Sequence, residues 1–130
     1  MQKLVEADRR ATGFDRSDLI SHFASRAGSA VYETGGAIGL VRTGRKARQI
    51  GPVYSNSEDE AIALVERIVD KESASLVIDL SAAQSDAHEF VLSRGFVFER
   101  PFSRMRFGGG AAKACCDSGE LIAIAGPEFG

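Results

Sequence analysis

Two amphipathic helix patterns enclose a short apolar run, and this arrangement limits the folds that the chain can adopt. Residues 57–71 repeat apolar side chains at helical spacing, and residues 81–95 do the same up to Gly95. Between them, Leu76–Leu80 is apolar except for Asp79, which is typical of a central strand covered on both faces. The pattern predicts an α/β (α+β) domain in which a central sheet lies between helices.

The part of the chain before residue 57 adds further helices and strands to this core. We expect a short charged helix at residues 3–10 and a second helix that ends before Gly28. Short β-prone runs with turn residues between them follow, at 30–33, 37–42 and about 47–54. Runs joined by such short turns pair in antiparallel fashion, so we expect a mixed, mostly antiparallel sheet.

The last third of the chain is predicted to finish the sheet. Phe96–Phe107 is expected to be a long strand, at an edge or bulged at Pro101, because proline cannot donate to a strand ladder. The small and polar residues 108–119 predict a flexible connection to a last short strand at Leu121–Ala125. An exposed edge on that last strand would favour a homodimer, because free strand edges pair readily.

Length and charge exclude several classes of protein. A chain of 130 residues provides one hydrophobic core, so we expect a single domain spanning residues 1–130. The hydrophobic fraction of 44% is enough to offset chain entropy, which predicts a folded protein. The net charge of −2 gives no general attraction to nucleic acid or to anionic lipid, so neither is an expected partner.

The sequence favours a cytoplasmic location. Charged residues interrupt the first 30 positions, and no later run approaches the roughly 20 apolar residues that a membrane span needs. Cys115 and Cys116 are adjacent, so they cannot join distant segments, and no His cluster accompanies them to form a metal site. We expect a reducing compartment, no metal, and two packed rather than reactive thiols.

Local motifs add a family resemblance to this general picture. AHEFVLSRGFVFERPFSRM, at residues 87–105, resembles the region of the GNAT acyl-CoA-dependent N-acetyltransferases in which a helix ends in a Gly-Phe pair before a strand. RQIGPVY, at residues 48–54, is similar to their fourth strand, which lies along the acyl-CoA. RPFSRM and the closing IAGPEFG look most like the second half of tandem GNAT proteins, so the chain is interpreted as a C-terminal fragment of such a protein.

The resemblance implies a place for acetyl-CoA as co-substrate. It implies cofactor contacts from the end of the fourth strand, the loop after it and the following helix, at Val53, Tyr54, Ser55, Asn56 and Gln84. In the family, the pyrophosphate binds backbone N–H groups of a Gly-rich loop at a helix start, where the helix dipole favours anions.

The loop of this chain departs from that pattern. SNSEDE contains no glycine, and Glu58, Asp59 and Glu60 fall in the first turn of the predicted helix. These carboxylates are themselves stabilised by the helix dipole and would repel a pyrophosphate of like charge. Ser57 and Glu60 have the spacing of a capping box, so a well-capped helix that binds nothing is the favoured interpretation.

Candidate catalytic residues are few. The resemblance places a general-acid tyrosine at the position of Val91, which has no proton to give. Tyr54 is a candidate donor near the acyl group, although it could also simply pack. Asp79 is either a general base with a pKa raised by burial or a strand-end residue satisfied by a backbone N–H. His88 is expected to be structural.

Arginines form two groups. Those around the turn at residues 42–48 are expected to lie on a solvated, ion-paired face. Arg100, Arg104 and Arg106 share one face of a predicted strand by their spacing. Arg104 is the candidate substrate-binding residue among them, because a guanidinium donates two parallel hydrogen bonds to a carboxylate or phosphate. Its partner would be an internal acid such as Glu99, a substrate carboxylate, or a second GNAT domain.

The resemblance thus implies transfer of an acetyl group from acetyl-CoA to a small-molecule amine, in one lobe of a tandem protein. The alternative is a catalytically degenerate lobe that binds substrate or another protein. The missing glycines, the acidic helix start and Val91 favour the alternative.

Overall fold

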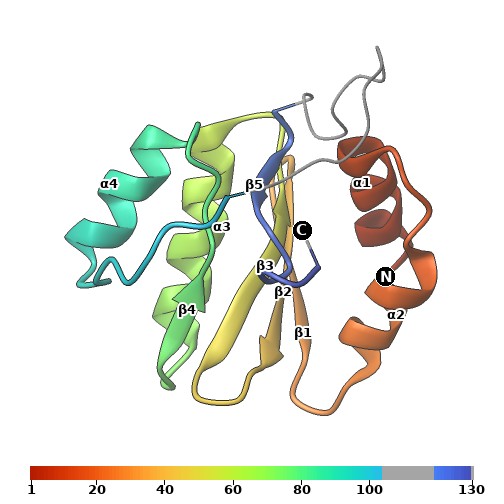
Figure 1. The fold of residues 1–130 in the computed structure, drawn as a ribbon, viewed down its shortest axis with the longest axis horizontal. Coiled ribbons are helices and arrows are strands. Elements are labelled where there is room, and N and C mark those ends of the chain that lie inside the picture. The colour runs from red at the N-terminus through yellow and green to blue at the C-terminus, as the bar shows by residue number, and fades with distance from the viewer. Residues whose placement is uncertain (104–118, 130) are drawn as a thin grey trace.

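The computed structural model describes residues 1–103 and 119–129, and Figure 1 shows their arrangement. Within these residues the helices are α1 (Gln2–Thr12), α2 (Ser17–Ser25), α3 (Glu58–Lys71) and α4 (Ser85–Ser93). The strands are β1 (Ala30–Thr34), β2 (Ala37–Thr43), β3 (Arg48–Tyr54), β4 (Leu76–Ile78) and β5 (Leu121–Ala123). The helices and strands predicted before residue 96 are all present, and β4 and β5 are shorter than the runs that predicted them.

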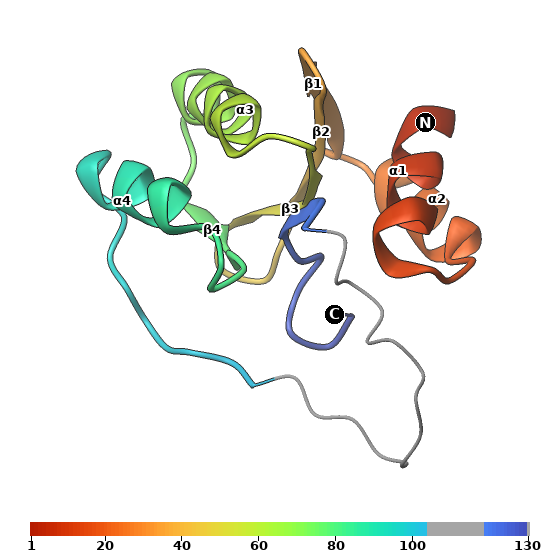
Figure 2. The same cartoon turned by 90° about the horizontal axis from the view of Figure 1, so that it is seen from above.

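The sheet lies between two layers of helices, as Figure 2 shows. On the side of α1 and α2, Leu4 and Leu40 are fully buried in one apolar cluster. On the side of α3, Leu64 and Ile50 are fully buried in a second cluster, and α4 packs beside α3. Because side chains alternate along a strand, β2 and β3 supply both clusters. The predicted mixed, mostly antiparallel sheet with helices on both faces is confirmed.

Pairing within the sheet follows chain order from β1 to β4. β1 and β2 form an antiparallel hairpin, whose turn uses Gly35 at a φ of 58°. β2 and β3 are also antiparallel, whereas β4 runs parallel to β3 and pairs with Arg48–Ile50. A parallel neighbour needs a crossover connection, which α3 provides.

β5 lies where β3 and β4 separate. β4 pairs with the first part of β3, and β5 pairs in antiparallel fashion with its end, at Val53 and Tyr54. On its other side, Ala123 forms a bridge with Leu80, and the Ile124 N–H donates to the Asp79 carbonyl oxygen at 3.0 Å. The expected exposed edge on the last strand is therefore wrong, because neighbours on both sides use its backbone groups.

Gly51 allows the chain to pass this close to β3. Its φ is +148°, a conformation that side-chain-bearing residues rarely adopt. A Cβ added there would lie 2.1 Å from the Ile124 carbonyl oxygen, closer than any two such atoms can approach. The glycine in the middle of β3 is thus the local requirement for the packing of the segment that follows β5.

The strand predicted at Phe96–Phe107 is wrong for its described part. Residues 96–103 leave α4 in an irregular extended conformation and pair with no described strand. Pro101 lacks the N–H that a ladder needs, and the described part of the segment does not pair with the outer edge of β4. Residues 104–107 lie outside the described residues, as does the predicted flexible connection at 108–119 apart from Gly119.

Candidate functional site

Tyr54 points into the layer between the sheet and α1. It is 2% exposed and packs in the cluster that contains Leu4 and Ile20. Its hydroxyl donates a hydrogen bond to the carboxylate of Asp8, which is itself 1% exposed. Burial raises the pKa of the Tyr54 phenol, and the bond to Asp8 raises it further, so the phenol keeps its proton. That proton is already donated within the core.

Arg16 completes this buried network. Its guanidinium donates to both oxygens of Asp8, at 2.5 and 3.2 Å, and to the Phe129 carbonyl oxygen. The hydrogen bond to Asp8 raises the pKa of Arg16. A buried carboxylate needs such partners, because an unpaired charge in a core is very costly. The network joins α1 and β3 to the residues after β5.

Two backbone donors of the loop after β3 have partners within the protein. The Ser55 N–H donates to the Glu120 carbonyl oxygen at 2.9 Å, and the Ser57 N–H donates to Ser55 Oγ at 3.1 Å. The predicted capping box is wrong, because the Ser57 side chain makes no capping bond at α3. Ser55 supplies the local bond instead, and Asn56 is exposed at the tip of the loop.

The starts of α3 and α4 lie side by side. The Glu58 carboxylate accepts a hydrogen bond from the Ala87 N–H at 2.8 Å. Gln84, the residue before α4, is 8% exposed and its N–H donates to the Ser81 carbonyl oxygen. The structure therefore brings Gln84 to the same end of the sheet as the loop at residues 55–57.

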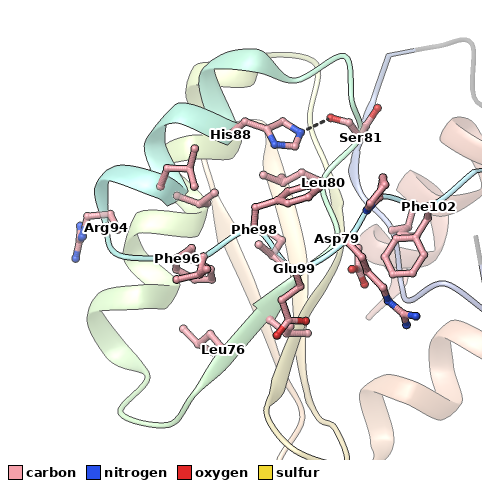
Figure 3. A pocket seen from close by; sticks show the side chains of 18 of the residues that line it. Leu76, Asp79, Leu80, Ser81, His88, Arg94, Phe96, Phe98, Glu99 and Phe102 are labelled. Carbon is pink, nitrogen blue, oxygen red and sulfur yellow. Dashed lines mark hydrogen bonds between the residues drawn. The ribbon is translucent and has the colours of Figure 1, made fainter.

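A groove of about 1220 Å³ opens on the far side of β5, between β4 and residues 96–103 (Figure 3). Its walls come from β4 and the residues after it, from α4, and from the extended segment that follows α4. This volume is above the range of roughly 300–1,000 Å³ that is usual for small-ligand sites. The groove is open to solvent, whereas the core around the other candidate residue, Tyr54, is closed.

Asp79 lies in this groove, directly after β4. Its carboxylate accepts a hydrogen bond from the Gln49 amide at 3.0 Å. Burial raises the pKa of the Asp79 carboxyl, and the bond from Gln49 offsets only part of that effect. A partly buried carboxylate in a groove with a raised pKa has the properties of a general base.

Tyr54 and Asp79 do not form one site. Ala123 of β5 pairs with Val53 on one side and with Leu80 on the other, so β5 lies between the end of β3 and the residues after β4. Val53 is fully buried in the cluster beneath α3. The candidate donor thus lies in the core beside α1, and the candidate base in the groove.

His88 and Val91 both lie on α4. His88 Nε2 is 3.1 Å from the Ser81 carbonyl oxygen, which fixes the turn between β4 and α4 as Figure 3 shows. Val91 is 6% exposed and packs at the inner side of the helix. Neither residue is thus placed as a general acid, because Val91 has no proton to give and His88 is hydrogen-bonded to Ser81.

Comparison with known families shows to which family the chain belongs. A family model described as an acetyltransferase (GNAT) domain matches residues 4–117. The chain belongs to this family. No curated protein and no solved structure gave a match. The resemblance seen in the helix that ends at Gly95-Phe96 and in the strand at residues 48–54 is therefore confirmed at the level of the GNAT family.

The residues that the resemblance assigns to the cofactor do not fit acetyl-CoA in the way that the family holds it. The edge of β3 at Val53 and Tyr54 is paired with β5. The N–H groups of Ser55 and Ser57 have internal partners, and three acidic residues stand in the first turn of α3. A pyrophosphate would meet negative charge there, and two backbone donors are already in use.

Some predicted residues fall outside this description. Arg104, the candidate substrate-binding residue, lies outside the described residues, as do Cys115 and Cys116. Within the described ranges, no group of three or more His, Cys, Asp or Glu residues is arranged to hold a metal ion. In the same ranges, no helix combines the length and the apolar character that crossing a membrane requires.

Arg42 differs from the expectation for the arginines near the turn at residues 42–48. It is 9% exposed, lies over the ring of Phe23 at 4.7 Å from the ring centre, and donates to the Ala125 carbonyl oxygen at 2.5 Å. Burial lowers the pKa of Arg42. Arg48 does form an ion pair, with Glu72 at 2.8 Å. The turn cluster is thus partly a solvated face and partly core.

Proposed function

We propose that this GNAT domain takes part in N-acetyl transfer as a lobe that holds substrate or a partner protein, without itself binding acetyl-CoA. An acetyl-CoA-binding GNAT domain, in the same chain or in another, would supply the acyl donor. The groove between β4 and residues 96–103 is the surface of the lobe that remains open for this task.

The observation that carries the proposal is the pairing of β5 with the end of β3. In the family, the strand that corresponds to β3 lies along the acyl-CoA. Here the edge of β3 at Val53 and Tyr54 is paired with β5. Displacing β5 would also break the bridge at Leu80 and the bond from the Ile124 N–H to Asp79. Several backbone groups would then lose their partners, which opposes entry of a ligand at this edge.

Electrostatics at α3 support the same proposal. Glu58, Asp59 and Glu60 form its first turn, where the positive end of the helix dipole already interacts with their carboxylates. Glu58 is further used to bind the Ala87 N–H. The start of α3 therefore joins two helices instead of offering an anion site.

Calorimetric titration of the protein with acetyl-CoA tests the proposal. We expect no binding heat and no thermal shift at millimolar ligand. The triple variant Glu58→Gln, Asp59→Asn, Glu60→Gln should also fail to bind, because the Ser55 and Ser57 N–H groups stay in use. Micromolar binding by the wild-type protein would overturn the proposal. Binding by the triple variant alone would show that charge, not β5, is the obstacle.

Catalysis by this chain is a second candidate, which the position of Asp79 favours. A carboxyl with a raised pKa in an open groove could remove the proton of an amine that binds there. The test is acetyl transfer from acetyl-CoA to a mixture of primary amines by the purified protein. Turnover that Asp79→Asn lowers by about 10²-fold or more would support this candidate. Turnover unchanged in Asp79→Asn would exclude Asp79 as the base.

A further inference from the structure

The outer edge of β4 is open. β4 pairs with β3 on one side, and among the described residues no strand pairs with its other side. A strand edge of this kind presents backbone N–H and C=O groups in the spacing that another extended chain can match. Residues of β4 line the groove, and Figure 3 shows Leu76 among them.

The opposite wall is also extended and unpaired. The Phe96 N–H donates to the Val91 carbonyl oxygen, but no described residue makes a backbone hydrogen bond with residues 97–103. Val97 and Phe98 are 83% and 68% exposed, which is unusual for large apolar side chains that lie next to each other. The groove thus lies between two backbones that both lack a neighbour in the described chain.

Charges are unevenly distributed along the groove. At one end Arg94 is neutralised by Asp70 and Glu66, at 2.6 and 3.4 Å. Towards the other end, where Figure 3 shows Phe102, the Asp79 carboxylate has the neutral Gln49 amide as its hydrogen-bond donor.

Other charges near Asp79 leave it available to a cation. At longer range Arg100 and Arg42 lower the pKa of the Asp79 carboxyl, whereas Glu128 raises it. Arg100 lies over the Phe102 ring, 4.9 Å from the ring centre. Within the described part of the chain, no cation forms a salt bridge with Asp79. A ligand with a positive group placed near Asp79 would therefore find a carboxylate that has no salt-bridge partner among the described residues.

We propose that this groove holds an extended polypeptide segment as an added strand on β4, with a basic side chain of that segment against Asp79. The inference rests on the proposed function and names its substrate class: the amine is presented by a polypeptide, not by a small molecule. Main-chain hydrogen bonds to β4 give affinity, as in other cases of strand addition. Phe98 and Phe102 provide apolar contacts, and Asp79 selects the cation.

Selection from peptide libraries tests the proposal, because it lets the protein choose among many peptide sequences. Two displayed libraries of peptides about eight residues long, within the usual length of strands, carry a fixed central Lys or a fixed central Glu. We expect the purified protein to enrich the Lys library, with apolar residues at alternate positions. Enrichment of neither library, or of both equally, would overturn the proposal.

Synthetic copies of an enriched peptide then separate the two contacts. Fluorescence anisotropy should show affinity about tenfold lower for Asp79→Asn and unchanged affinity for Asp86→Asn, an exposed residue on α4. Methylation of alternate backbone nitrogens should abolish binding, because it removes the N–H donors of the strand. Unchanged binding of the methylated peptide would exclude strand addition, and unchanged binding by Asp79→Asn would exclude the cation contact.

Two further outcomes keep the inference separate from the proposed function. Sedimentation that shows a stable dimer of the protein alone, which the peptide does not dissociate, would assign the groove to a second copy and overturn the inference. Micromolar binding of acetyl-CoA would overturn the proposed function while leaving peptide binding in place. Failure to bind peptide, with no binding of acetyl-CoA, would overturn only the inference.

Discussion

Asp8 and Asp79 are both acidic residues near the central sheet, and their surroundings differ. Asp8 lies on the inner face of α1, where Arg16 and Tyr54 donate to it and almost none of its surface is exposed. Asp79 lies in the groove beside β4, where a neutral amide is its donor. A carboxylate whose partners are all internal holds the fold together, whereas one with spare acceptor capacity remains available to a ligand.

The largest effect is expected on the α1 side. Asp8→Ala removes the acceptor that Arg16 and Tyr54 share and leaves Arg16 with the Phe129 carbonyl oxygen alone, which should lower the free energy of unfolding by about 3–5 kcal/mol. Urea unfolding measures this loss. Glu89→Gln on the exposed surface of α4 is the control, with an expected change within about 0.5 kcal/mol. A loss below about 1 kcal/mol would show that the network contributes little to stability.

Apolar packing should not distinguish the two faces. Leu4 on the inner face of α1 and Leu64 on the inner face of α3 are both fully buried, so Leu4→Ala and Leu64→Ala should each cost about 3 kcal/mol. The same urea experiment compares them. If Leu64→Ala cost less than half as much as Leu4→Ala, the helix layer next to the groove would be the more adaptable one.

Asp79 should affect stability in a pH-dependent manner. Its pKa is raised above the ordinary 3.8, so the folded state binds more protons than the unfolded state in the pH window above 3.8, and stability falls as pH rises through that window. Asp79→Asn removes the titrating carboxyl, and with it this loss of stability at rising pH. The variant should match the wild-type protein near pH 3 and gain stability relative to it by pH 7, as measured by urea midpoints. A relative loss with rising pH would contradict the sign of the shift.

The smallest effect is expected at the wall of the groove. Phe98 is 68% exposed, so Phe98→Ser should change the free energy of unfolding by no more than about 0.5 kcal/mol. The same variant should weaken the binding of an enriched peptide. A stability loss above about 1 kcal/mol would mean that residues 96–103 pack more tightly than their exposure indicates.

Sequence patterns predicted the parts of the fold that local periodicity controls. The helix at 58–71 and the hairpin of β1 and β2 follow from apolar spacing and from turn glycines. Phe96, Val97 and Phe98 have strand-forming side chains, which is why a strand was expected at residues 96–107. The prediction failed in its described part because a strand also needs a paired neighbour, and residues 96–103 have none among the described strands. Local propensity cannot identify which segment occupies the place next to β3.

The candidate site was predicted less completely for the same reason. Asp79 was found because a charge in an apolar run is visible in the sequence. Asp8 was missed, although it follows Leu4 by four positions and precedes Ala11 by three, so it falls on the buried face of α1. Its partners Arg16 and Tyr54 are separated from it along the chain, and only the tertiary structure brings them together.

The central position of β5 has a consequence for how the protein folds during its synthesis. During synthesis, α1, α2 and the first three strands emerge before the residues that complete the sheet beside Val53 and Leu80. Until residues 121–123 arrive, the nascent chain exposes an unpaired strand edge in the middle of its sheet. Such non-local pairing slows folding, so the step most exposed to aggregation on the ribosome is the closing of this gap by β5.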